Sequence, residues 1–562
     1  MRKRILLFAV LISILSYAGK TIRTVTYAFD DATVPTAGTL RYEIENAADG
    51  DSIVIPATVG KLTLEQEILI KKNIGINANG LIIQVETPSG SNYRVFNIGE
   101  GTPLTVVIDK AILKGGNLTG NNTTDVKDLA NCGGSILVNN YATLVLKNSS
   151  VVNGLGNYAG AIYGAENTVM HLTNCYFTGN EATTNNAGAV YNLGELNVNY
   201  CLFEGNKSAL DGAALTSNKT FTTIRNSVFY GNESATSTSA NNGGAYFNTG
   251  TATSTLATVE NCTFYNNAAL NKGAGAYTAS GGAKAVFTNC TFHGNRNNSA
   301  TGAGAIYLRN STATLVNCTV TGNSTIESGA GGGINISTTA PKLYLVNSIV
   351  AYNYKGITPD DVYVGAGLAN GTNNVVGAAT GTALENSISF SYNPESYLFA
   401  EYTTDNGKKV PVLKDNGGIS CLGEVIKTVA LVDYAGEVMS VAMETAAPSV
   451  EGYNIPAKDQ RGYLRNATYP CVGAFELNGI TAVKDIKSDV ALKIYPNPAR
   501  DYISLSSSGQ ILKAEIITLS GQKLRMYSLP GQTISLSGIN PGIYLMTIYT
   551  DHGNTTQRIS VY

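Results

Sequence analysis

The chain has 562 residues, of which 38 are lysine or arginine and 40 are aspartate or glutamate, giving a formal net charge of −2 at pH 7. Charged residues make up only 14% of the chain and form no basic run, which argues against a nucleic-acid partner. The length allows several domains, although a solenoid of stacked repeats can occupy a long span as one unit.

Residues 1–18 are predicted to be a secretory signal peptide. The positive start Arg2-Lys-Arg4 precedes an apolar run over residues 5–15, and Ser16-Tyr-Ala18 has the small-x-small pattern of a cleavage site. The apolar run is too short to span a bilayer. The sequence therefore predicts an exported, soluble mature protein.

Residues 19–129 are predicted to form an N-terminal cap and the first coils of a solenoid. Leu40, Ile44 and Ala47 fall on one face of a helix that Gly50 ends. Short β-rich runs follow, and their order resembles the opening coils of bacterial right-handed β-helix proteins.

Residues 130–355 repeat one motif, seen most clearly from Leu172 to Asn180 (LTNCYFTGN). Its Cys/Ser position recurs at steps of 26 to 35 residues, with an apolar residue three positions before it and another two positions after it. Self-similarity at such a period predicts stacked coils that bury their apolar faces against one another. The eight copies of the Cys/Ser position are Ser149, Cys175, Cys201, Ser227, Cys262, Cys290, Cys318 and Ser348.

The repeat also predicts the path of each coil. The two apolar positions cannot share one face of a straight strand, so the chain must bend just before the Cys/Ser position. Asparagine, which tolerates the left-handed conformation, occupies that place in seven of the eight copies, and Tyr200 is the exception. A Gly-Asn pair predicts a second turn, and a Gly-small-apolar signal such as Gly160-Ala-Ile-Tyr163 predicts a third strand. Together these features predict an all-β, right-handed parallel β-helix.

Two asparagine columns, one before and one five residues after the Cys/Ser position, are predicted to form ladders of side-chain amides. The column cysteines Cys175, Cys201, Cys262, Cys290 and Cys318 are predicted to stack inward as a structural column. Adjacent coils bring Cα atoms within disulfide range, but serine alternates at the same position, so bridging is not required. Cys421 and Cys471 lie off the column and are the better disulfide pair. No cysteine or histidine spacing predicts a metal site, and no cofactor is predicted.

Residues 356–477 are predicted to hold the last coils and a closing segment. The pair Asp360-Asp361 is predicted to be a solvated turn. Asp459-Gln-Arg-Gly462 and Gly473-Ala-Phe-Glu476 resemble the choice-of-anchor module that follows β-helix repeats in secreted bacterial proteins. The resemblance implies that these two segments close the solenoid and that the protein is attached to a surface.

A short polar linker over residues 478–491 precedes residues 492–562, where short alternating strands and turn signals predict a small Ig-like β-sandwich. Its motifs closely resemble the C-terminal sorting domain of type IX secretion substrates in the Bacteroidetes. The resemblance implies export by the type IX machinery, cleavage by a cell-surface sortase, and anchoring to lipopolysaccharide at the cell surface or release outside it. The residues assigned to the sorting motif, and not to catalysis, are Tyr495, Pro496, Asn497, Pro498, Gly542 and Tyr544.

Candidates for chemistry are few. Glu181 and Glu233 share one repeat position two coils apart, roughly 10 Å along the stack, and are weak candidates for a catalytic pair. Five tyrosines are predicted to pack between coils, and stacking on sugars is the weaker alternative if they are exposed: Tyr163, Tyr191, Tyr246, Tyr277 and Tyr307. The sequence predicts a non-catalytic adhesin or glycan-binding rod that contacts glycans or a host surface. The alternatives are a polysaccharide lyase or glycoside hydrolase, and a purely structural envelope protein.

Overall fold

The computed structural model forms two compact units, Met1–Gly479 and Ile480–Tyr562. The predicted signal peptide, the predicted linker and Pro498 lie outside the residues that the structure describes. The described residues are 21–85, 93–118, 129–234, 244–250, 255–270, 273–337, 341–365, 367–380, 384, 387–389, 391–392, 398–432, 440–477, 493–497, 499–506, 511–518, 523–528, 533–550 and 553–561.

One regular coil shows how the first unit is built. It runs through β14 (Ile162–Gly164), β15 (Val169–Thr173), β16 (Tyr176–Thr178) and β17 (Glu181–Ala182) before β18 (Val190–Asn192) starts the next turn. Asn174 turns the chain between β15 and β16 with φ +54°, and Gly179 turns it before β17 with φ +63°. The predicted asparagine corner and Gly-Asn turn are therefore confirmed. The two-residue strand β17 was not predicted.

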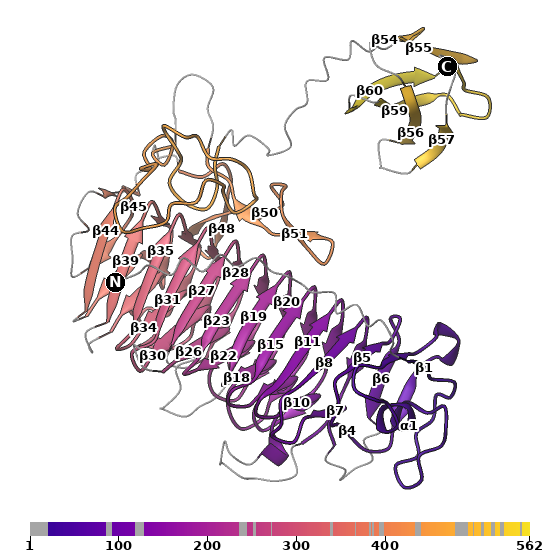
Figure 1. Ribbon diagram of the computed structural model, residues 1–562. Helices are drawn as coiled ribbons and strands as arrows, with labels where there is room; N and C mark the ends of the chain where they lie inside the picture. The colour runs from indigo at the N-terminus through magenta and orange to yellow at the C-terminus, as the bar shows by residue number, and fades with distance from the viewer. Residues whose placement is uncertain are drawn as a thin grey trace, which may run out of the picture. The chain divides into compact units, whose positions relative to one another are not determined.

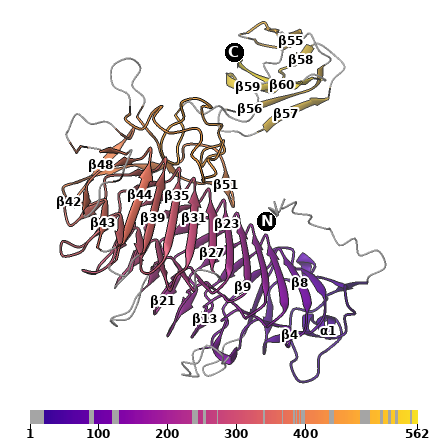
Figure 2. The same cartoon turned by 60° about the vertical axis from the view of Figure 1, so that its left-hand side comes forward.

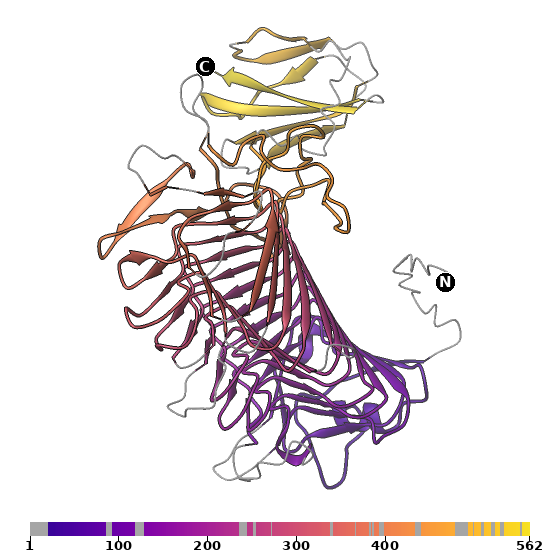
Figure 3. The same ribbon diagram turned by 90° about the vertical axis from the view of Figure 1, so that its left-hand side faces the viewer.

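Equivalent strands of successive coils pair in parallel and form four sheets (Figures 1, 2 and 3). The exception is the last strand of sheet D, which pairs antiparallel with β41 (Tyr354–Lys355). Within the described ranges, sheets A and B have 13 strands each, sheet C has 12 and sheet D has 9. The predicted all-β parallel solenoid is thus confirmed. Sheet A runs from β1 (Ile22–Thr24) to β44 (Leu368–Thr372), sheet B from β3 (Leu62–Leu64) to β47 (Ile388–Ser389), sheet C from β4 (Ile68–Ile70) to β46 (Ala379–Thr380), and sheet D from β13 (Leu155–Gly156) to β42 (Thr358–Pro359).

The core between the sheets consists of rows of like side chains. A phenylalanine row stacks ring on ring, with centroids of adjacent rings 4.5–5.0 Å apart and every ring fully buried. Neighbouring coils thus bury the faces that a single coil leaves open. The row consists of Phe177, Phe203, Phe229, Phe264 and Phe292.

A short helix covers the first coils. Helix α1 (Leu40–Glu45) begins at Thr39, whose hydroxyl accepts a hydrogen bond from the Tyr42 amide, and it buries Leu40 and Ile44. The helix is shorter than predicted because its C-cap is Asn46. No helix in the described part of the chain is long and apolar enough to cross a bilayer.

A fully buried asparagine ladder follows the Gly-Asn turns of the coils. Each Nδ2 donates to Oδ1 of the next asparagine at 2.8–3.0 Å, and Asn267 Nδ2 also donates to the Phe229 carbonyl at 2.9 Å. Since these amides are paired on both sides, they add no unsatisfied polar group to the core. This inner ladder, which confirms the prediction, consists of Asn180, Asn206, Asn232, Asn267, Asn295, Asn323 and Asn353.

The inner ladder ends on Asp361, where Asn353 Nδ2 donates to Asp361 Oδ1 at 2.8 Å. Asp361 Oδ2 accepts from the Ala378 amide at 2.8 Å and from the Tyr392 hydroxyl. Asp360 and Asp361 are both buried, so the predicted solvated turn is wrong. The groups that bury Asp361 lie on neighbouring coils and are not visible in the local sequence.

The outer asparagine ladder lies at the corners between sheets A and B and has a gap. Asn174 donates to Asn148 at 2.8 Å, and Asn261 donates to Asn226 at 3.2 Å. Tyr200 interrupts the column and adopts φ +53°, so Asn226 donates instead to Asn199 Oδ1 at 3.0 Å.

The closing segment, described over residues 398–432 and 440–477, lies along the outer face of sheet B (Figure 1). Gln460 Nε2 donates to the Cys262 carbonyl at 3.2 Å and to Thr263 Oγ1 at 2.7 Å, and the Ala474 amide donates to Thr319 Oγ1 at 3.0 Å. The two motifs predicted to close the solenoid therefore pack along its side, across several coils.

Arg465 fastens the closing segment to the solenoid. Its Nη1 lies 3.3 Å from Glu476 Oε2, and its Nη2 donates to Asn289 Oδ1 at 2.9 Å. Both charged side chains are almost fully buried, so each depends on the other for compensation.

The second unit contains two small antiparallel sheets that share one buried cluster of side chains. The Ig-like arrangement of these sheets stays a prediction. One sheet consists of β54 (Lys493–Tyr495), β55 (Tyr502–Ser506) and β58 (Thr533–Ser535), and the other of β57 (Lys523–Ser528), β56 (Ile511–Thr518), β59 (Gly542–Thr550) and β60 (Gly553–Val561).

Candidate functional site

The carboxylates of Glu181 and Glu233 lie in one row of sheet D, two coils apart. Strand β21 (Lys207–Ser208) lies between their strands β17 and β25 (Glu233–Ser234), and Lys207 pairs in register with both glutamates. The row therefore alternates acid, base and acid. Such a row suits mutual charge compensation better than it suits two carboxyls facing an open bond.

The five candidate tyrosines are buried, with side chains 0–9% exposed. Tyr163 and Tyr191 point outward from sheet C but stack on each other, with ring centroids 5.2 Å apart, under a cover of apolar residues. Tyr246 pairs with Tyr277 and shares the register of core residues such as Leu215, so these two rings point inward. Burial therefore removes all five tyrosines, Tyr307 included, as platforms for an exposed sugar.

The column cysteines are buried free thiols. Cys175 Sγ lies 3.3 Å from the carbonyl oxygens of Leu146 and Thr173, and Ser227 Oγ makes the equivalent bond to Arg225 at 2.6 Å. Serine and cysteine thus fill the same role. Burial raises the pKa of the Cys201, Cys290 and Cys318 thiols well above the usual range, which makes thiolate chemistry unfavourable there.

The structure does not bring Cys421 and Cys471 together. Both are free thiols, and they belong to different buried clusters. Cys421 packs against Val228 beside sheet B, whereas Cys471 packs in the cluster of Ile349 near the last coils. The distance along the solenoid between these clusters explains why the predicted bridge is not formed.

A polar pocket of about 360 Å³ opens on sheet C near the N-terminal end of the solenoid. We call it the Glu67 pocket. It lies over β4, β7 (Phe96–Ile98) and β10 (Ile136–Val138), which are neighbouring strands of sheet C. Its lining consists of Glu67, Tyr93, Arg94, Asn97, Leu129, Ala130, Leu137 and Asn139.

The polar side chains of the Glu67 pocket are connected by two hydrogen bonds and one ion pair. Asn139 Nδ2 donates to Asn97 Oδ1 at 2.7 Å, and Asn97 Nδ2 donates to Glu67 Oε1 at 3.1 Å. Arg94 Nε lies 3.4 Å from Glu67 Oε2. These side chains therefore hold one another in fixed positions, so ordering them would add little entropy cost to the binding of a ligand.

Arg94 is the buried anchor of the Glu67 pocket, with only 3% of its surface exposed. Its Nη2 donates to the carbonyls of Leu129 and Ala130, each at 2.9 Å. Burial lowers the pKa of Arg94, and the neighbouring Glu67 carboxylate opposes that shift. The pair places opposite charges at the pocket wall together with two amides and the half-buried Tyr93 ring.

Sequence reasoning missed this pocket. Glu67 lies just before β4, Asn97 within β7 and Asn139 just after β10, so 30 and 42 residues separate the partners along the chain. The opening coils lack the Cys/Ser position that aligns the later coils. A search for polar residues in the outward position of sheet C would have found Asn97, which pairs in register with Leu137.

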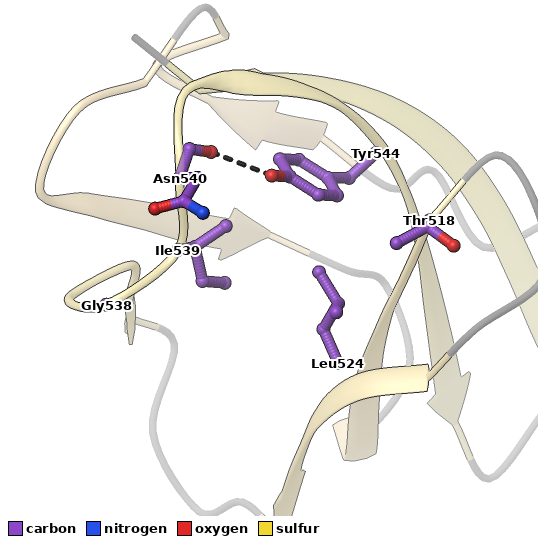
Figure 4. Close-up of a pocket in the computed structure, with 6 residues that line it drawn as sticks. All are labelled: Thr518, Leu524, Gly538, Ile539, Asn540 and Tyr544. Carbon is purple, nitrogen blue, oxygen red and sulfur yellow. Dashed lines mark hydrogen bonds between the residues drawn. The ribbon is translucent and has the colours of Figure 1, made fainter.

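The second unit has a pocket of about 320 Å³ beside the predicted sorting motif (Figure 4). Tyr544 lines it and donates its hydroxyl hydrogen to the Asn540 carbonyl at 2.8 Å. Gly542 sits next to this turn, where an added Cβ would lie 3.3 Å from the Tyr544 hydroxyl oxygen. Asn497 Oδ1 accepts from the Ser560 amide at 2.9 Å and so ties the predicted motif to β60, while Tyr495 is exposed.

Two family models match parts of the chain. Residues 236–393 match a right handed beta helix region, and residues 493–562 match a secretion system C-terminal sorting domain. The chain carries a right-handed β-helix region and a type IX sorting domain. A comparison with the curated proteins finds no match.

The sorting domain implies handling by the type IX secretion machinery and export through the outer membrane to the cell surface or beyond. Among the described residues, no three His, Cys, Asp or Glu side chains are grouped so that they could hold a metal ion. Because a β-helix supports many activities, the function must be argued from the Glu67 pocket itself.

Proposed function

We propose that this secreted surface protein is a glycan-binding adhesin and that the Glu67 pocket is its carbohydrate site. The observation that carries the proposal is the connected row of Asn139, Asn97 and Glu67 beside the Tyr93 ring. Sugar hydroxyls both donate and accept hydrogen bonds, and the pocket offers amide, carboxylate and guanidinium groups held in fixed positions. The Tyr93 ring offers an apolar face beside them.

The arrangement favours binding over hydrolysis. Both Glu67 carboxylate oxygens are engaged, one by Asn97 and the other by the Arg94 guanidinium. With both oxygens occupied in this way, the carboxylate serves as a fixed hydrogen-bond acceptor for a sugar hydroxyl. A polysaccharide lyase or glycoside hydrolase on the same scaffold is the alternative that the test must address.

Attachment to the cell is part of the same proposal. An N-terminal signal peptide starts export, a sortase removes the sorting domain near residues 478–491, and lipopolysaccharide anchors the mature protein. The closing segment, which resembles a choice-of-anchor module, packs along the outer face of sheet B. The glycans would then belong to another cell, a host surface or the surrounding matrix.

The test uses the full chain and a panel of neutral and acidic polysaccharides, following both retention on the immobilised glycans and release of reducing or unsaturated ends. We expect retention without product, and at least a tenfold loss of retention in Glu67→Gln and Tyr93→Ala. The matched control is Glu181→Gln, which removes an exposed carboxylate on sheet D. Product formation would overturn the adhesin in favour of an enzyme. Absence of retention would favour a structural role.

A further inference from the structure

A second hollow lies on the outer face of sheet A, around Gly75. It is formed by β2 (Ser52–Val54), β5 (Ile74–Asn77), β8 (Leu104–Asp109) and β11 (Ala142–Lys147), which pair in parallel in that order. Gly75 pairs in register with Ser52 on one side and Val107 on the other. The hollow has a volume of about 170 Å³ and no lining residue in common with the Glu67 pocket.

Nothing in the packing around Gly75 requires a glycine. Its backbone is outside the left-handed region, and an added Cβ would have Ser52 Oγ as its nearest neighbour, at an ordinary 3.6 Å. Other strand glycines differ: a Cβ on Gly164 would lie 2.6 Å from Met170 Cε, and one on Gly371 would lie 2.5 Å from Asn374 Nδ2. Glycine inside a strand costs stability and often marks a place where a ligand approaches the backbone. The effect of Gly75 is to keep the hollow open.

The rim of the hollow carries mixed hydrogen-bonding groups. Asp109 Oδ2 lies 3.5 Å from Lys147 Nζ, and Asp109 Oδ1 accepts from Asn148 Nδ2 at 2.8 Å. Asn77 Oδ1 accepts from the Asn79 amide at 3.0 Å, and the Asn77 NH₂ group adds a hydrogen-bond donor to the side chains that line the hollow. Ser52 adds a hydroxyl that can donate or accept.

The floor of the hollow is apolar, since it consists of the Gly75 backbone and the Val107 side chain. An apolar floor with a rim of alternating donors and acceptors complements a sugar ring, which has one C–H face and hydroxyls around its edge. The volume is well below the roughly 300 Å³ at which pockets for drug-sized ligands begin, so it fits one ring and not an oligosaccharide. Because Asp109 is paired with Lys147, the rim carries no net charge.

We propose that the hollow at Gly75 is a second carbohydrate subsite, which takes one neutral hexose ring. The inference rests on the proposed function only for the class of ligand, since the two sites share no residue. With two sites on different sheets, the rod could hold two glycan chains or two points of a branched one at once. Linked weak sites raise the overall affinity without any new contact.

The experiment titrates methyl glycosides of neutral hexoses into the full chain and measures dissociation constants by calorimetry. We expect a millimolar dissociation constant for at least one hexoside, weakened at least tenfold by Gly75→Val and left unchanged by Glu181→Gln, which removes an exposed carboxylate on sheet D. Valine fits a strand and fills the hollow, so Gly75→Val should melt at the same temperature as the wild type or higher. Asn77→Ala gives a second variant, which removes one rim donor together with the hydrogen bond to the Asn79 amide.

The outcomes separate the two proposals. Hexoside binding that survives both Gly75→Val and Asn77→Ala, or no hexoside binding at all, overturns the subsite. A clear fall in the melting temperature of Gly75→Val would show that the glycine serves packing and would also overturn the argument, unless Asn77→Ala alone weakens binding. If Glu67→Gln loses polysaccharide retention but still binds the hexoside, the result supports both the Glu67 site and the Gly75 subsite. Hexoside binding without any polysaccharide retention keeps the subsite and rejects the proposed function.

Discussion

Asn353 donates its side-chain amide to Asp361 Oδ1 at 2.8 Å, so a ladder of neutral amides ends on a buried carboxylate. A carboxylate offers only acceptors, and it receives the two N–H groups of Asn353, the Ala378 amide and the Tyr392 hydroxyl. An asparagine at this place would present an NH₂ group to one of those donors. The last rung therefore differs chemically from all the others.

The first prediction concerns pH. Burial raises the pKa of Asp361 to about 7, although its hydrogen bonds oppose the shift, and burial also raises the pKa of Asp360. A carboxyl whose folded pKa exceeds its unfolded value stabilises the fold fully below about pH 4, and this stability is lost as the pH rises through the folded value. We expect the free energy of unfolding to fall by about 2–4 kcal/mol between pH 4 and pH 8. Denaturant unfolding at several pH values measures this change in the free energy of unfolding.

Asp361→Asn should remove most of that pH dependence, since the variant has no proton to lose at this site. The exposed Asp405→Asn is the control and should leave the slope unchanged. A wild-type protein whose stability rises from pH 4 to pH 8 would contradict the assignment.

The second prediction concerns a middle rung of the inner ladder. Asn267→Ala removes two donated and two accepted hydrogen bonds, and it leaves the Phe229 carbonyl and the Asn232 amide groups unsatisfied in the core. We expect a loss of about 3 kcal/mol or more in the free energy of unfolding. Asn148→Gly, in the exposed outer ladder, keeps the left-handed corner unstrained and should cost about 1 kcal/mol or less. Equal losses in the two variants would show that burial does not set the cost.

The third prediction concerns the gap in the outer ladder. Tyr200 holds a left-handed backbone that costs non-glycine residues about 1–2 kcal/mol and that asparagine adopts more readily. Tyr200→Asn should therefore raise the free energy of unfolding by about 1 kcal/mol and let the new amide join Asn174 and Asn226. The matched control Tyr141→Asn also relieves a left-handed tyrosine but joins no ladder, so it should gain less. A destabilised Tyr200→Asn variant would show that the ring packs usefully where it is.

The fourth prediction concerns the closing segment. Arg465→Met leaves the Glu476 carboxylate buried without its cation and removes the contact with Asn289. Breaking such a pair costs about 3–5 kcal/mol, so proteases should cut the closing segment faster than they do in the wild type. The double variant Arg465→Met with Glu476→Gln should recover part of the loss. Lys414→Met, which breaks an exposed pair with Glu401, should leave the cleavage rate unchanged.

The regular coils could be predicted from the sequence because each coil repeats the same pattern of apolar, asparagine and Gly-Asn positions. Asn174 and Asn226 turn the chain where predicted, and the two ladders lie where the asparagine columns predict them. The tyrosines pack on two different faces of sheet C, because Tyr163 and Tyr246 stand one residue apart in register, and one residue reverses the face of a strand. Both faces are also covered, which no single coil reveals.

The site could not be predicted because it depends on contacts between irregular coils. Glu67, Asn97 and Asn139 occupy successive coils, and no repeat marker aligns them. The side-on packing of Gln460 against Thr263 joins residues 197 positions apart, which local patterns do not encode. The hollow at Gly75 was missed for the opposite reason, since one glycine among 60 carries no signal until its neighbours are known.

Asn180, Asn206 and Asn232 are each 26 residues apart, so one coil of 26 residues could be added or removed as a unit. Each asparagine donates its Nδ2 to the asparagine of the following coil and accepts at Oδ1 from the asparagine of the preceding coil. Removing or duplicating 26 residues would therefore leave the hydrogen bonds of the ladder unchanged. Each such event would alter the separation between the Glu67 pocket and the last coils by about 4.8 Å. Gene rearrangement could thus change this separation without altering the pocket or the last coils.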